Sequence, residues 1–261
     1  MSNDVLVEKI DRTAVVTINR PESRNSITKR VVDELAAALN ATHDDASIRC
    51  VVLTGAGGHF CAGADLRRTF AEDPDMMERL DAYLDSFHSL VRAIVRCPKP
   101  TIASLDGCAV GFGADMALAC DLRVATTSAY IQEKFVNIGL MPDGGGTFWL
   151  PRLLGTARAM RAILLSEKLG AADLESLDLL AVPPVAPSEL TSTTRALAQK
   201  IEKGPPLAYA AAKAAVYASW GDLEAALVRE REGQIRLLKS NDCIEGVMAW
   251  AQKREPDFTG S

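Results

Sequence analysis

The chain has 261 residues, and 48% of them are apolar, which is enough to bury one large core. Its 29 basic and 34 acidic residues are interspersed and leave a net charge of −5, which argues against nucleic acid and anionic membranes as main partners. No apolar run reaches the length of a membrane span, and the first nine residues lack the basic and apolar regions of a secretory signal.

Six cysteines are scattered through the sequence, at positions 50, 61, 97, 108, 120 and 243. None belongs to a Cys-x-x-Cys pair, and none has a histidine at the spacing of a zinc site. We therefore expect reduced thiols in the core of a cytoplasmic protein, with no bound metal.

Strands and helices are expected to alternate along the first part of the chain. Strands are predicted at 5–10, 13–19, 49–54, 100–105 and 122–125, and longer helices from about 29 to 42 and from 77 to 96. Residues 130–139 are predicted as an irregular turn, followed by helices at 147–154 and 155–165. After a linker at 182–187, residues 187–253 are predicted to be helical, with breaks at 204–206 and 221. This order predicts parallel strands with right-handed crossovers and a helical tail.

Glycine-rich turns recur near residues 55–66, 107–113 and 140–146. A strand that enters such a turn and leaves it as a helix exposes unpaired backbone N–H groups, which favour a negatively charged oxygen. The first two turns could each contribute one N–H, near Gly63-Ala64 and near Gly111-Phe112. Two N–H groups that converge on one oxygen form an oxyanion hole.

Two aspartates lie beside these turns. Asp115 falls in the first turn of the helix that follows the second glycine turn, and Asp143 lies between Met141-Pro142 and further glycines. Apolar surroundings would raise the pKa of Asp143 toward a value useful for proton exchange. Together with the hole, these acids predict enolate chemistry next to a polarised carbonyl. Asp115 could instead stabilise a helix dipole, and Asp143 could cap the next helix.

Four segments, in this order, resemble the enoyl-CoA hydratase/isomerase (crotonase) superfamily: Phe60–Leu66, Gly107–Gly113, Ala117–Asp121 and Gly139–Gly145. Arg20-Pro21 followed by Asn25-Ser26 is similar to the first loop of that family, so the resemblance covers nearly the whole chain. It implies an α/β fold, with a crotonase-like spiral of ββα units at 1–195 and a helical trimerisation region at 196–261. It also implies a homotrimer or a dimer of trimers.

The resemblance further implies an acyl-CoA thioester substrate and no cofactor apart from the coenzyme A that the substrate carries. The backbone N–H groups of Ala64 and Phe112 fall where the family has its oxyanion-hole donors. For the CoA part of the substrate, the resemblance implies Arg24 near the phosphates and Ala62, Asp65 and Leu66 on the loop that grips the pantetheine and adenine. It places Gly111 beside the hole and Phe135 in the pocket. It also places Lys253 and Phe258 in a tail that closes the site, often that of a neighbouring subunit.

The chain departs from the hydratases of this family at both of their glutamates. The first position is Asp115, and the second aligns with Phe135, which can hold neither a water nor a proton. Asp143 occupies a position used by several isomerases and by the dehalogenase branch. The pattern most resembles enoyl-CoA isomerases, including those that act on ring or diene substrates. It implies that Asp143 shuttles the proton while Asp115 assists.

Three alternatives stay open. A hydratase would activate water with Asp115 alone, and a non-catalytic homologue would bind CoA esters without turnover. A thioester hydrolase or aryl-CoA dehalogenase would use Asp143 as nucleophile, with His88 as base if that side chain reaches the pocket. The acyl group is not identified, although aromatic pocket walls are suggested by Phe112, Phe135, Phe148 and Trp149.

Overall fold

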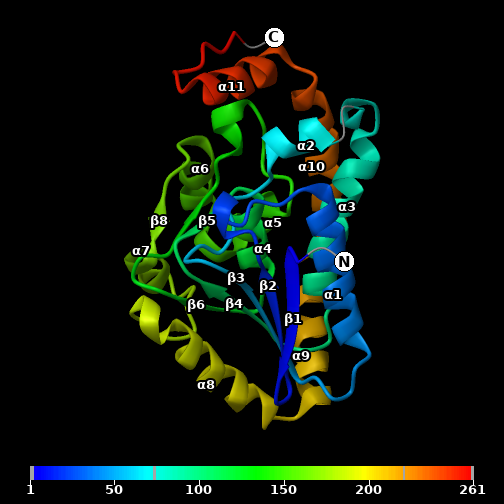
Figure 1. The fold of residues 1–261 in the computed structure, drawn as a ribbon, viewed down its shortest axis with the longest axis vertical. Coiled ribbons are helices and arrows are strands. Elements are labelled where there is room, and N and C mark those ends of the chain that lie inside the picture. Colours follow the sequence, from blue (N-terminus) through cyan, green and yellow to red (C-terminus); the bar gives the residue numbers. More distant parts are fainter. Residues whose placement is uncertain (1–2, 73–74, 220, 260–261) are drawn as a thin grey trace.

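The larger sheet of the protein has five strands. The computed structural model, which describes residues 3–72, 75–219 and 221–259, gives the strand order β1-β2-β3-β4-β6 (Figure 1). These strands are β1 (Val5–Ile10), β2 (Thr13–Ile18), β3 (Cys50–Gly55), β4 (Thr101–Leu105) and β6 (Leu122–Ala125). β1 and β2 form an antiparallel pair, and the other neighbours are parallel. The predicted α/β class with parallel strands is confirmed.

A smaller sheet has the order β5-β7-β8. Its strands are β5 (Cys108–Val110), β7 (Tyr130–Gln132) and β8 (Leu169–Gly170). A further bridge pairs Cys61 with Ala109, so the first glycine turn is joined to this sheet. The sequence patterns predict a turn where β7 lies and do not predict β8, because strands of two or three residues are too short to show an apolar periodicity.

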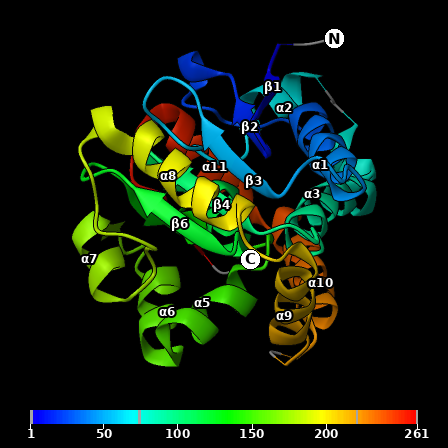
Figure 2. The same ribbon diagram turned by 90° about the horizontal axis from the view of Figure 1, so that it is seen from below.

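Helices cover both faces of the larger sheet. α1 (Lys29–His43) packs on one face with α3 (Leu80–Val95) beside it, and α8 (Leu190–Glu202) crosses the other (Figure 2). Side chains alternate across a strand, so the apolar run of β3 fills both sides: Val51 and Leu53 lie in the main core, whereas Cys50 and Val52 face α8.

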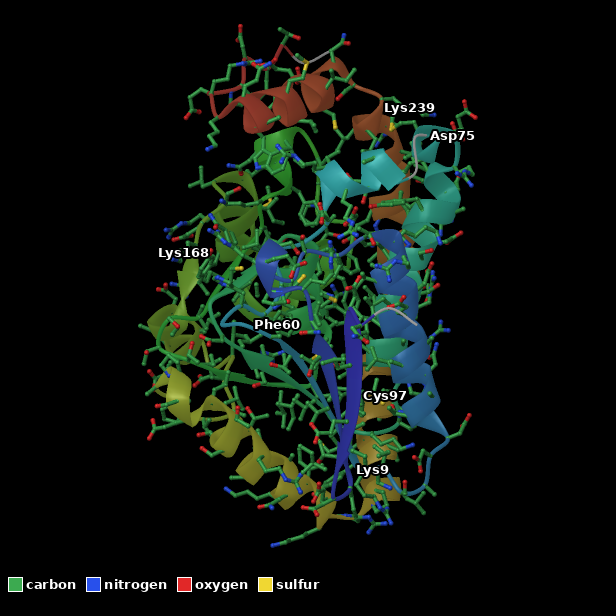
Figure 3. All side chains as sticks on the ribbon, viewed as in Figure 1. Lys9, Phe60, Asp75, Cys97, Lys168 and Lys239 are labelled. Carbon is green, nitrogen blue, oxygen red and sulfur yellow. The ribbon has the colours of Figure 1, made fainter. Side chains whose placement is uncertain are left out.

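The shorter helices surround the smaller sheet and the glycine turns. They are α2 (Leu66–Glu72), α4 (Phe112–Ala119), α5 (Gly146–Leu154), α6 (Thr156–Leu164) and α7 (Ala171–Ser176), with 3₁₀ turns η1 (Pro21–Ser23), η2 (Met76–Glu78), η3 (Phe135–Ile138) and η4 (Pro187–Glu189). α4 is buried along its whole length, as its apolar, alanine-rich sequence requires. Figure 3 shows the buried Phe60 near the centre of the molecule and Lys168 and Lys239 near its edges.

The C-terminal region consists of α8 followed by α9 (Pro206–Ser219), α10 (Leu223–Leu238) and α11 (Asn241–Gln252). The helical character and the breaks at 204–206 and 221 are confirmed. A further break precedes α11, whose N-cap Ser240 accepts a hydrogen bond from the Cys243 N–H over 3.1 Å. Neither Gly nor Pro marks this break, which explains its absence from the prediction. The division at residue 195 stays a prediction, since α8 extends across it.

All six cysteines are buried and unpaired, as expected for reduced core thiols. Among the described residues, none of the helices has both the length and the apolar character needed to cross a membrane.

Candidate active site

The first two glycine turns lie directly against each other. The Cys61 N–H donates to the Cys108 carbonyl over 2.9 Å, and the Val110 N–H donates to the Cys61 carbonyl over the same distance. Gly63 has a φ of +91°, and a Cβ there would lie 2.7 Å from the Val110 carbonyl oxygen. Glycine is therefore required at position 63 both for its backbone conformation and for this close approach.

Ala64 directly follows Gly63, and Phe112 directly follows Gly111. Phe112 is the first residue of α4, so its N–H has no acceptor within the helix. Within the described part of the chain, neither the Ala64 N–H nor the Phe112 N–H donates to another backbone group. Both residues line the same cavity.

This cavity has a volume of about 390 Å³ and lies between the glycine turns, α3, η3 and the C-terminal helices. The predicted site residues that line it are Ala62, Ala64, Leu66, Gly111, Phe112, Phe135 and Asp143. α3 adds Tyr83, Leu84 and Phe87. The Phe87 ring packs edge-on against that of Phe112, with centroids 4.7 Å apart. The aromatic residues that line the cavity therefore include Tyr83 and Trp250 as well as Phe87, Phe112 and Phe135, whereas Phe148 and Trp149 are buried in α5 away from the lining.

Four predicted substrate-binding residues lie outside this cavity. The exposed Arg24 contributes its carbonyl, which accepts from the Ala62 N–H over 3.0 Å. The Asp65 carboxylate turns to Arg20, 3.0 Å away. Lys253 and Phe258 do not line this cavity, and Phe258 lies at a second cavity beside Leu237.

The tail reaches the cavity through other residues. Trp250, near the end of α11, lines it together with Arg254, Glu255 and Pro256. Arg254 is held by its ion pair with Glu245, at 2.5 Å. The C-terminal tail, which the sequence predicts to close a substrate site, therefore covers the cavity of its own chain.

Asp143 brings a buried carboxyl group to the cavity wall, with 9% of the residue exposed. Gln234 donates from Nε2 to Asp143 Oδ2 over 2.7 Å. Burial raises the pKa of Asp143 to about 7, against the lowering effect of the Gln234 hydrogen bond. A carboxyl group that titrates near neutrality can both take and return a proton.

Asp115 lies behind the cavity wall. Its carboxyl group is fully buried, and Oδ2 accepts from the Gly144 N–H over 3.0 Å. Within the described chain, Asp115 Oδ1 and both carboxyl oxygens of the buried Glu133 have no hydrogen-bond donor. Burial and neighbouring acids raise the pKa of Asp115 well above its usual value and that of Glu133 to about 8. Burial therefore favours the protonated forms of both groups.

His88 is fully buried on α3, with Nε2 3.0 Å from the main-chain oxygen of Asp143. Burial lowers the pKa of His88 to about 4, so the ring is neutral at pH 7 and its Nε2–H donates to this carbonyl. His88 does not line the cavity. It holds the backbone of Asp143 and has no contact with the carboxyl group.

Three buried residues near Asp143 are absent from the sequence-based site: Glu133, Glu230 and Gln234. Glu230 and Gln234 lie one turn apart on α10, on the side that also buries Ala226 and Leu227. Polar side chains on the apolar stripe of a helix require partners. The presence of Glu230 and Gln234 on the apolar side of α10 is therefore the signal from which the sequence could have indicated these two residues.

Comparisons with known proteins agree with this geometry. The family model described as enoyl-CoA hydratase/isomerase matches residues 8–261. A Rhodobacter capsulatus protein named probable enoyl-CoA hydratase is 42% identical over 250 residues, covering 95% of this chain and 94% of that protein. The 1,2-epoxyphenylacetyl-CoA isomerase of Escherichia coli is 37% identical over 247 residues, covering 94% of each.

Among solved structures, an enoyl-CoA hydratase from Mycobacterium avium subsp. paratuberculosis K-10 matches with a TM-score of 0.89 and 35% identity, covering 98% of both chains. The predicted crotonase-like fold is thereby confirmed. On its sequence and on its fold, this chain belongs to the enoyl-CoA hydratase/isomerase (crotonase) family.

Proposed function

We propose that the protein is an enoyl-CoA isomerase in which Ala64 and Phe112 form the oxyanion hole and Asp143 moves the proton. The observation that carries this proposal is that, among the described residues, Asp143 is the one buried acid lining the cavity that Ala64 and Phe112 also line, and the N–H groups of these two residues donate to no backbone acceptor. The position at which hydratases of the family have their second glutamate is the aromatic Phe135, which also lines the cavity.

In the proposed reaction the thioester oxygen of an unsaturated acyl-CoA accepts hydrogen bonds from both amides. The Asp143 carboxylate takes a proton from the carbon beside the double bond, and the electrons of that C–H bond delocalise toward the thioester oxygen. The same carboxyl group returns the proton to the far end of the conjugated system, so the double bond moves. No water is added, and the only coenzyme is the CoA of the substrate.

A hydratase is the second candidate, because the R. capsulatus relative is named as one. In this chain the activation of water would fall to Asp115, whose carboxyl group is fully buried and does not line the cavity. A hydrolase or dehalogenase with Asp143 as nucleophile would need a base, and His88 lies outside the cavity lining and hydrogen-bonds to the main-chain oxygen of that residue. These observations favour isomerisation.

The test is a panel of enoyl-, dienoyl- and aryl-CoA esters incubated in heavy water and followed by mass spectrometry. An isomerase incorporates deuterium without gaining the mass of water. Addition of water would identify a hydratase, and free CoA would identify a hydrolase. Tight binding of the esters without any change in them would identify a non-catalytic homologue.

We also propose that the protein assembles as a homotrimer or a dimer of trimers. The proposal is supported by large apolar side chains on the surface, at the C-terminal end of α6 and on α9, where Leu164, Leu165 and Leu207 are 60%, 73% and 85% exposed. Such side chains mark interaction surfaces. Light scattering after size-exclusion chromatography should give the mass of three or six chains, and the mass of one chain would contradict the proposal.

A further inference from the structure

The loop that carries Asp143 is bound to α10 on both sides of that residue. After Asp143, the Gly145 N–H donates to Glu230 over 2.8 Å, and the Thr147 N–H donates to the same carboxyl group over 2.9 Å. Before it, the Met141 N–H is bound one helical turn further along α10. Two points on one helix therefore determine the position of the loop.

Gln234 makes the second of these contacts and also reaches the carboxyl group itself. Its Oε1 accepts from the Met141 N–H over 3.2 Å, and its Nε2 donates to Asp143 Oδ2 over 2.7 Å. Only the oxygen of an amide side chain can accept a hydrogen bond, so the contact with Met141 determines which way the amide faces. In this orientation the Gln234 N–H group always faces Asp143 Oδ2.

We propose that Gln234 is a positioning residue for the reaction. Its amide donates a hydrogen bond to Asp143 Oδ2 and so holds the carboxyl group in one rotamer, in which Oδ1 takes and returns the substrate proton. This inference rests on the proposed isomerase function. General-base transfer requires the accepting atom within about 2.6–3.2 Å of the proton donor, and a carboxyl group free to rotate would not hold one oxygen there.

Among the described residues, no titratable group that faces Asp143 donates a hydrogen bond to its carboxyl group. Asp115 on α4, Glu133 after β7 and Glu230 on α10 are acids, and each is affected by the negative charge of Asp143. His88 on α3 donates to the main-chain carbonyl and not to the carboxyl group. Removing the Gln234 amide therefore leaves a buried carboxylate without its stabilising donor, which should raise the pKa of Asp143.

The test is Gln234→Met, which keeps the length of the side chain but has no N–H. We expect kcat to fall about 10- to 100-fold and KM to change less, because the Gln234 amide is bound to Met141 and Asp143 although the residue also lines the cavity. The acidic limb of the kcat/KM profile, expected near pH 7 in the wild type, should move up by about one pH unit. Gln234→Glu should move it further, since two adjacent carboxyl groups share one proton.

The matched control is Gln199→Met, at an exposed glutamine of α8, and it should change neither kcat nor the pH profile. Thermal melting of each variant checks the fold. A fall in kcat with an unchanged pH profile would mean that Gln234 only supports the loop, and it would overturn the positioning role. Wild-type kcat in Gln234→Met would overturn it as well.

A second measurement needs no turnover. The ¹³C carboxyl signal of Asp143, assigned by its loss in Asp143→Asn, is titrated without substrate in the wild type and in Gln234→Met. We expect the midpoint to rise by about one pH unit in the variant. An unchanged midpoint overturns the inference even if the enzyme is an isomerase. If no ester reacts with the wild type, the proposed function fails, while this titration still decides whether Gln234 acts on the carboxyl group.

Discussion

The two walls of the cavity are built from different parts of the chain. The proposed oxyanion hole is main chain, contributed by residues that directly follow Gly63 and Gly111. The acid wall is Asp143, whose main-chain carbonyl accepts from His88 and whose carboxyl group accepts from Gln234, which lie 55 and 91 residues away in sequence. The first wall thus depends on backbone conformation and tolerates changes of side chain, whereas the second depends on particular side chains from distant helices.

Asp143→Asn should break the acid wall and leave the hole intact. We expect the deuterium-exchange rate to fall about 10²- to 10⁴-fold, because an amide cannot accept the proton. The Asn oxygen can still accept from Gln234, so the melting temperature should change little. Asp178→Asn is the matched control, since that residue is exposed and has a φ of +55°, which Asn tolerates. Wild-type exchange in Asp143→Asn would mean that another group is the base.

Gly63→Ala should break the other wall. The new Cβ would lie 2.7 Å from the Val110 carbonyl and would separate the two turns, so we expect a loss of about 10²- to 10³-fold in kcat, as for the loss of one oxyanion-hole donor. Gly155→Ala is the control: its φ is +73°, but nothing lies within 4 Å of the added Cβ. This control should lose stability and keep its kcat. Equal losses of kcat in both variants would contradict the role of the hole.

Glu133→Gln tests whether the buried acids next to Asp143 are protonated in the folded protein. The pKa of Glu133 is raised to about 8, so the folded protein keeps a proton that the unfolded chain releases above its usual pKa near 4.5. Glu133 therefore lowers the stability progressively as the pH rises between these values. Gln does not titrate and can donate to Asp115 Oδ1. We expect about 1–3 kcal/mol more stability at pH 8 and no gain at pH 4, measured by urea unfolding.

The control for this variant is Glu202→Gln. Burial raises the pKa of Glu202, but hydrogen bonds from Arg195 and Thr13 lower it more, so the net shift is downward. Its removal should therefore reduce the stability at pH 8. A loss of stability in both variants would show that Glu133 is ionised and paired in the folded protein, contrary to our interpretation.

The smallest effect is expected where the tail meets the cavity. Trp250 lines the cavity but is 56% exposed, so Trp250→Ala should raise KM about two- to fivefold and leave kcat unchanged. Met248→Ala, at a residue 47% exposed on the same helix and outside the cavity lining, is the control and should leave KM unchanged. A fall in kcat in Trp250→Ala would place the tail closer to the reacting atoms than we propose.

Much of the fold and one wall of the site follow from short stretches of sequence. The apolar run of β3 and the amphipathic pattern of α3 predict these elements to within a few residues, because each depends on neighbouring side chains. The glycines at 63 and 111 also act locally, since a positive φ is a property of the residue itself. The family follows from the same local motifs, which occur in the expected order.

The acid wall could be predicted only in part. Asp143 is identifiable from its neighbours, but the position of Asp115 behind the wall follows from the packing of α4 against the loop at Gly144. The roles of Gln234 and His88 depend in the same way on α10 and α3 meeting that loop. The sequence by itself determined where the backbone turns and which acids are available. The tertiary structure decided which acid faces the cavity and what holds it, because contacts between distant segments are set by the packing of whole elements.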